Sequence, residues 1–291
     1  MAAGYWCAEL GVRALVLEKG SEIGGQLLWT YNPIHNHLGV MAANGREFCD
    51  LVAKQVESSA MEVRLGVETR AIDLKNKSLE LSDGTNLSAD AIVIASGVRR
   101  RKLDAPGEEE FAGKGILLSG AKEKEAASGL DVCVVGGGDA AFENALILAE
   151  FARSVTLVHR SANFLAREEF TEKVFAHPKI KIITGAAVSA IKGNERVEAV
   201  EIVSREDGSK SELPVQAVLI RIGIVPNTEL FRGQIALDEK GFIIVNERCE
   251  ASVEGVEGVY AVGDVANPFS KNISTAVGMG AMAANVITSR L

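Results

Sequence analysis

The chain has 291 residues, of which 47% are hydrophobic and 24% are charged, and its net charge is −8. This length suggests about two globular domains. The acidic balance argues against nucleic acid as the main partner, because phosphate backbones attract basic surfaces. No apolar run reaches the ~18 residues of a membrane span, and the opening residues lack the basic leader of a secretory signal.

The first third of the chain alternates between helical and strand patterns. We expect helices over 2–10 and 45–58, strands over 14–17, 62–65 and 91–94, and a polar β-meander over 79–86. The first of these strands ends at Glu18, and the last leads into Gly97.

The middle of the chain repeats this order after an additional opening segment. An apolar strand over 131–135 leads into Gly136, Gly137 and Gly138, followed by a helix over 140–152 and a strand over 155–158. Glycines in this G-x-G-x-x-A pattern allow a tight turn and let a dinucleotide pyrophosphate approach the helix N-terminus. A helix over 167–176, a strand over 180–183, a meander and a strand over 217–222 complete the copy.

The two copies differ where they begin. Aligning Glu18 with His159 leaves the segment 131–141 without a counterpart in the first copy. We expect that the true start lies upstream and supplies a central strand and a glycine loop. The alternative is a genuine truncation with an impaired cofactor site.

The last segment contains a strand over 258–262, closed by Gly263 and Asp264, and a helix that begins at 272–274 and extends to about 290. Together with VLEKGSEIGGQL, DAIVIASG, DVCVVGGGDAAFENAL, VTLVHR and LIRIGIVPNT, this segment resembles the low-molecular-weight thioredoxin reductases and the related ferredoxin–NADP reductases. The resemblance runs essentially end to end. It implies an α/β fold with two Rossmann-like dinucleotide-binding domains of the three-layer ββα type, the second inserted in the first.

The same resemblance implies domain boundaries and binding residues. The FAD-binding domain would cover 1–115 and 246–291, and the NAD(P)-binding domain 116–245. In the first, Glu18 would accept from a ribose hydroxyl, and the N-terminus of the last helix would stabilise reduced flavin. The implied FAD residues are Glu18, Gly25, Gln26, Gly97, Gly263, Asp264, Asn272, Ile273 and Ser274. The implied NAD(P) residues are Gly136, Gly138, Asp139, Ala140, Glu143, His159, Arg160 and Gly223.

The choice between NADPH and NADH depends on the end of the second strand of the second copy. Arg160 stands there, where an arginine suits the 2′-phosphate of NADP. The family pattern has two further arginines, at positions where this chain has Ser161 and Leu165, with Arg167 as a nearby substitute. We expect NADPH, with NADH as the alternative.

The cysteines distinguish this chain from the thioredoxin reductases. Cys7, Cys49, Cys133 and Cys249 are scattered, which disfavours a disulfide framework and a zinc site and favours a cytoplasmic protein. The family's C-x-x-C pair corresponds here to Ser119 and Lys122, so we expect no internal redox disulfide.

These observations support two functional hypotheses. The first is an FAD-dependent NAD(P)H oxidoreductase with no catalytic side chain, because the flavin carries the chemistry. Its acceptor would be a ferredoxin, flavodoxin, quinone or external disulfide, and by resemblance it would be a homodimer. The basic run 99–102 would steer an acidic partner or be a solvated loop. The alternative is a flavin- or nucleotide-binding protein without turnover, such as a sensor or a decayed enzyme.

Overall fold

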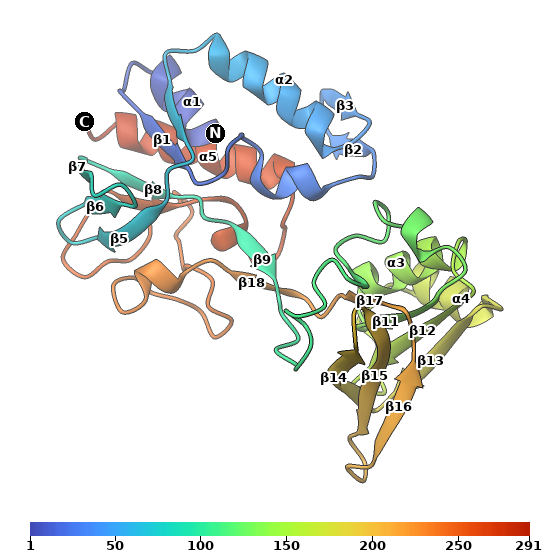
Figure 1. The fold of residues 1–291 in the computed structure, drawn as a ribbon. Helices are drawn as coiled ribbons and strands as arrows, with labels where there is room; N and C mark the ends of the chain where they lie inside the picture. Colours follow the sequence, from blue (N-terminus) through green and yellow to red (C-terminus); the bar gives the residue numbers. More distant parts are fainter. The chain divides into compact units, whose positions relative to one another are not determined.

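The computed structural model describes all 291 residues, which form two compact units (Figure 1). Unit 1 comprises Met1–Arg99 and Val225–Leu291, and unit 2 comprises Arg100–Ile224. The chain passes between the units at β9 (Val98–Arg100) and β18 (Ile224–Pro226), which pair with each other. None of the helices is long and apolar enough to cross a bilayer.

The boundaries between the two units lie at 99/100 and 224/225, earlier in the chain than the predicted boundaries of 115/116 and 245/246. Phe111 packs in a core of unit 2, and the carbonyl of Pro106 accepts a 2.8 Å hydrogen bond from the amide of Ile191. Phe231 and Ile243 pack with Leu74 in a core of unit 1. Burial of these apolar side chains therefore assigns 100–115 to unit 2 and 225–245 to unit 1.

Unit 2 contains a five-stranded parallel sheet of order β10-β17-β11-β12-β13. Its strands are β10 (Ile116–Leu117), β11 (Asp131–Val135), β12 (Ser154–His159), β13 (Ile180–Thr184) and β17 (Ala217–Ile220). The central strand β11 lies between β17 and β12, and its residues from Val132 to Val134 are fully buried. Such a continuous apolar run is typical of a parallel strand covered on both faces.

Two layers cover this sheet, as Figure 1 shows. Alternate side chains of β11 point to opposite faces. Val132 and Val134 pack with helices α3 (Asp139–Ala149) and α4 (Glu168–Ala176). Cys133 and Val135 pack with the antiparallel strands β14 (Ala186–Gly193), β15 (Val197–Ser204) and β16 (Lys210–Pro214). Unit 2 is therefore a three-layer ββα domain.

Unit 1 repeats the plan with a divided sheet. Its parallel strands form two separate pairs, β1 (Leu15–Glu18) with β4 (Glu62–Leu65) and β8 (Ile92–Ile94) with β19 (Val259–Ala261). No strand lies between β8 and β1, the position that β11 has in unit 2. The meander consists of β5 (Thr69–Asp73), β6 (Ser78–Leu81) and β7 (Asn86–Ser88).

Three helices complete unit 1: α1 (Ala2–Glu9), α2 (Gly45–Glu57) and α5 (Ile273–Thr288). Helix α1 packs closely on α5, since a Cβ added at Gly280 would lie 2.8 Å from the amide nitrogen of Ala3. The short helices η1 (Gly25–Trp29) and η4 (Gly263–Val265) carry four of the predicted FAD residues, and β2 (Ile34–His37) and β3 (Val40–Ala42) form a hairpin. The helices η2 (Glu125–Ala127) and η3 (Glu229–Phe231) are single turns.

Candidate dinucleotide-binding sites

The glycine loop of unit 2 follows the buried strand β11. Gly136 has a φ of 146°, and a Cβ there would lie 2.1 Å from the carbonyl oxygen of Arg221. A Cβ at Gly137 would lie 2.3 Å from the imidazole of His159. Both positions therefore require glycine. At Gly138, by contrast, a Cβ would meet open space.

The start of α3 presents free hydrogen-bond donors beside this loop. Gly138 is its N-cap and offers no side-chain cap. The amides of Asp139 and Ala140 lie in the first helical turn, where no intrahelical acceptor exists, and no other backbone acceptor contacts them. Free amides at the positive end of a helix bind phosphate groups. This loop thus fits the pyrophosphate of a dinucleotide.

The carboxylate of Asp139 is held by the loop that follows β12. Its two oxygens accept from the backbone nitrogen of Arg167 at 2.7 Å and from Nε of Arg167 at 2.8 Å. The backbone hydrogen bond of Arg167 is the main reason that the pKa of Asp139 is lowered. Arg167 also pairs with Glu169 at 3.1 Å. Arg167 is therefore already neutralised within the chain.

The end of β12 presents one cation that has no ion-pair partner in the chain. His159 stacks on Phe164 with ring centroids 5.3 Å apart, and its Nε2 lies 3.1 Å from the carbonyl oxygen of Asn163. Arg160, next in the chain, is exposed, and Leu165 is 90% exposed. Of the arginines near this strand end, Arg160 is the one available to a 2′-phosphate.

Gly223 lies near the carboxyl end of β17, the strand that neighbours β11. It has a φ of 99°, and its carbonyl accepts a 3.0 Å hydrogen bond from the amide of Arg101. The chain order reverses between β11 and β17, and ligands of such sheets bind at this point. The structure therefore brings Gly223 and the glycine loop to the same edge of the sheet. Glu143 lies one turn into α3, half-buried.

In unit 1, Gln26 and Gly97 come together. Gly97 has a φ of 65°, and a Cβ there would lie 3.6 Å from Nε2 of Gln26. Gly25 begins η1 with a φ of 52°. Glu18 ends β1, and its carboxylate accepts from the amide of Gly20 at 2.7 Å. That bond shapes the turn after β1.

A second group of predicted FAD residues surrounds the start of α5. Asn272 caps this helix, since its Oδ1 accepts from the amide of Thr275 at 2.9 Å. The turn at Gly263, which has a φ of 73°, packs beside the helix, with a Cβ there 3.5 Å from that of Ala276. The amides of Ile273 and Ser274, like those of α3, have no acceptor among the backbone hydrogen bonds.

Two further features adjoin this helix start. Burial raises the pKa of the half-buried Asp264, against the opposing effect of Lys271. His37 of β2 lies 3.0 Å from Ser274, joining Nδ1 to Oγ across 237 residues of sequence. Sequence reasoning missed His37, because no local pattern links a histidine in a short hairpin to a distant helix.

The two units thus fit a dinucleotide to different extents. Unit 2 offers a glycine loop, open amides and a cation at the next strand end. Unit 1 offers open amides on α5, the half-buried Asp264 and the pair of Gln26 and Gly97. These features suit the flavin end of FAD, and no strand of unit 1 has the place that β11 has in unit 2.

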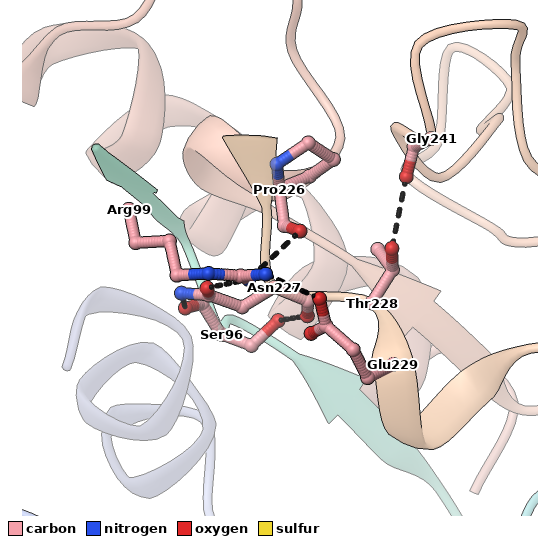
Figure 2. A network of polar contacts seen from close by, with 7 residues as sticks. All are labelled: Ser96, Arg99, Pro226, Asn227, Thr228, Glu229 and Gly241. Atoms are coloured by element: carbon pink, nitrogen blue, oxygen red, sulfur yellow. Dashed lines mark hydrogen bonds and ion pairs between the residues drawn. The ribbon is translucent and has the colours of Figure 1, made fainter. Parts of the chain in front are cut away.

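The basic run 99–102 is largely engaged by neighbouring groups. Figure 2 shows Arg99 donating to Oδ1 of Asn227 at 2.8 Å and to the carboxylate of Glu229 at 2.6 Å. The same Asn227 exchanges hydrogen bonds with Ser96, at 2.8 Å and 2.7 Å. Lys102 pairs with Glu109 at 2.8 Å. Arg99 of β9 and Ser96 just before it therefore both hold the segment that follows β18 within unit 1.

Comparison with known proteins identifies the family. The family model described as pyridine nucleotide-disulphide oxidoreductase matches residues 1–280. The chain belongs to this family. It is 34% identical over 288 residues to a thioredoxin reductase of Mycolicibacterium smegmatis, covering 97% of this chain and 91% of the relative. It is 32% identical over 285 residues to a thioredoxin reductase of Streptomyces coelicolor, covering 97% and 87%.

A solved structure supports the same conclusion. The thioredoxin reductase of Lactococcus lactis matches with a TM-score of 0.86 at 29% identity, covering 100% of this chain and 95% of that one. The expected α/β fold with two Rossmann-like domains is therefore confirmed. As a thioredoxin reductase-like member of its family, the chain is an oxidoreductase that uses FAD and a nicotinamide dinucleotide.

Proposed function

We propose that this protein passes electrons from NAD(P)H through FAD to an external acceptor without an internal pair of redox cysteines. The supporting observation is the state of its thiols. All four cysteines are free and buried. At the positions that correspond to the family's C-x-x-C, Ser119 is buried and Lys122 is exposed.

The thiols are also poorly suited to redox chemistry on electrostatic grounds. Thiolates, not thiols, attack disulfides. Burial raises the pKa of Cys133 to about 12, and it raises the pKa values of Cys7, Cys49 and Cys249 as well. All four therefore stay protonated at neutral pH, and we assign them to the apolar cores.

The protein's own residues would bind and orient the two cofactors. FAD would supply the redox chemistry when bound. The amides of Asp139 and Ala140 would hold the nucleotide pyrophosphate, and Arg160 would contact a 2′-phosphate. The amides of Ile273 and Ser274, at the positive end of α5, would favour negative charge on the flavin.

The experiment is anaerobic stopped-flow mixing of the FAD-loaded protein with NADPH or NADH, followed by addition of acceptors. We expect rapid loss of the visible flavin band. We also expect turnover with a quinone, a small redox protein or a disulfide to survive replacement of all four cysteines by serine. Loss of acceptor turnover in a folded four-serine variant would overturn the proposal.

A second candidate function is cofactor binding without turnover, which the single available arginine at the end of β12, Arg160, favours over a complete NADPH site. If both nucleotides bind and the flavin band persists, this second function holds. We further propose a cytoplasmic homodimer. Unit 1 exposes the apolar side chains of Leu38, Met41 and Phe269 at 99%, 82% and 96%, and sedimentation analysis of the purified chain tests the dimer.

A further inference from the structure

Arg221 of unit 2 holds a partly buried positive charge at the carboxyl end of β17. Its guanidinium donates to two carbonyl oxygens, from Nη1 to Ile220 and from Nη2 to Leu118, each at 2.8 Å. No carboxylate forms an ion pair with it in the chain. A charge removed from water without a counter-charge is costly, so the residue is suited to a ligand that supplies one.

A second arginine increases this cost. Arg100 of β9 donates from Nη1 to the same carbonyl oxygen of Leu118. Burial first, and then the charge of Arg100, lower the pKa of Arg221 to about 10. Glu123 opposes this shift without forming an ion pair with Arg221, and its Oε2 accepts from the amides of Leu118 and Ser119, at 2.7 Å and 2.8 Å. Two cations therefore converge on one neutral oxygen.

The loop that carries this oxygen is well anchored. The amide of Gly120 donates to Oδ1 of Asn144 at 2.9 Å, and Asn144 lies on α3. The Oγ of the buried Ser119 accepts from the amide of Lys122 at 3.3 Å. The carbonyl of Arg221 itself lies against Gly136. The two guanidinium groups are thus held on ordered backbone beside the glycine loop.

We propose that Arg221 and Arg100 form a binding site for the anionic group, phosphate or carboxylate, of a small ligand. Arginine forks match the planar oxygen pairs of such groups. The source is either the nicotinamide nucleotide itself or a small anionic acceptor. If the anion belongs to a small acceptor, the inference extends the proposed function and rests on it. The binding of an anion by the two arginines does not depend on the proposed function.

The test is thermal unfolding of the full chain in inorganic phosphate and in sodium chloride of equal ionic strength, followed by circular dichroism. We expect phosphate, at concentrations well above its Kd, to raise the midpoint by about 4 °C or more. The variant Arg221→Gln should show no phosphate-specific rise. Arg205→Gln, an exposed arginine elsewhere in unit 2, should behave as the parent does.

Arg100→Gln is the second variant, because Arg100 is exposed and its replacement opens no cavity in a core. It should reduce the phosphate-specific rise by half or more. Equal midpoints of the parent chain in the two salts would overturn the proposal, as would an unchanged rise in both variants.

Nucleotide titration then separates the two sources. If Arg221→Gln raises the Kd for NADPH tenfold or more and phosphate competes with NADPH, the site holds a phosphate of the nucleotide. If the Kd for NADPH is unchanged while the phosphate-specific rise is lost, the site serves an anionic acceptor. None of these readouts requires flavin reduction, so failure here is distinguishable from failure of the proposed function.

Discussion

Units 1 and 2 follow the same plan, yet their parallel sheets differ at the centre. In unit 2 the strand β11 joins the two halves of the sheet, whereas in unit 1 the two halves are separate pairs of strands. In unit 2, β12 is paired on both edges, and Leu157 is completely buried. In unit 1 the corresponding strand β1 pairs only with β4, and Val16, the counterpart of Leu157, is half-buried. The comparison teaches that a central strand does two things at once. It buries its neighbours, and it delivers the glycine loop to the carboxyl edge of the sheet.

The largest expected effect concerns the buried neighbours of that strand. Leu157→Ala should lower the free energy of unfolding of unit 2 by about 2–5 kcal/mol, because it leaves a cavity in a closed core. The same type of change, Leu17→Ala, on the half-buried β1 should cost only about 1 kcal/mol.

Urea unfolding separates the two effects, since both tryptophans, Trp6 and Trp29, lie in unit 1. Tryptophan fluorescence then reports unit 1, and circular dichroism reports both units. Equal losses for Leu157→Ala and Leu17→Ala would show that β1 is as well supported as β12.

The next effect concerns the glycine loop. Gly136→Ala would force a Cβ into the carbonyl of Arg221 at a strongly positive φ, and such strain costs about 1–3 kcal/mol. We expect the Kd for NADPH to rise by a factor of about 5 to 150, measured by fluorescence titration. The control is Gly66→Ala in unit 1, where φ is 69° but no atom lies near the added Cβ. A change in NADPH affinity for that control would contradict the assignment.

A smaller effect concerns the residue that follows β12 in unit 2 and its counterpart after β1 in unit 1. Arg160→Gln in unit 2 should weaken NADPH binding by about tenfold, the value of one charge-assisted hydrogen bond. Binding of NADH, which lacks the 2′-phosphate, should not change. The equivalent change in unit 1 is Lys19→Gln, which should leave both affinities unaltered. Calorimetry of the four protein–nucleotide pairs checks this, and equal losses for NADPH and NADH would exclude a 2′-phosphate contact.

The smallest effect concerns the two asparagines that cap helices, and it distinguishes a cap beside a cofactor site from a cap that only stabilises its helix. Asn272→Ala on α5 and Asn44→Ala on α2 each remove a side chain that accepts from a first-turn amide, at 2.9 Å and 3.0 Å. Each should cost about 1 kcal/mol of stability. Only Asn272→Ala should also change the fluorescence of bound FAD, because α5 carries the open amides. A similar change from Asn44→Ala would remove the distinction between the two helix starts.

Local pattern was sufficient for most of the elements. The apolar run over 131–135, the helix after the glycines and the strand over 155–158 appear as β11, α3 and β12 within a few residues. In the first copy, the helix predicted over 45–58 is α2, and the strand predicted over 14–17 is β1. Periodicity and glycine spacing are properties of neighbouring residues, so the sequence alone determined these elements and the duplicated plan.

Only the tertiary structure decided the remaining features, since they depend on residues far apart in the chain. It neutralised Arg167 with Asp139 and left Arg160 available. It joined His37 to Ser274, and it placed Arg221 beside Arg100 on one carbonyl oxygen. Long-range contacts of this kind carry no periodic signal. The folding of both units fixes which charges meet, and that pairing determines which side chains remain free to bind a ligand.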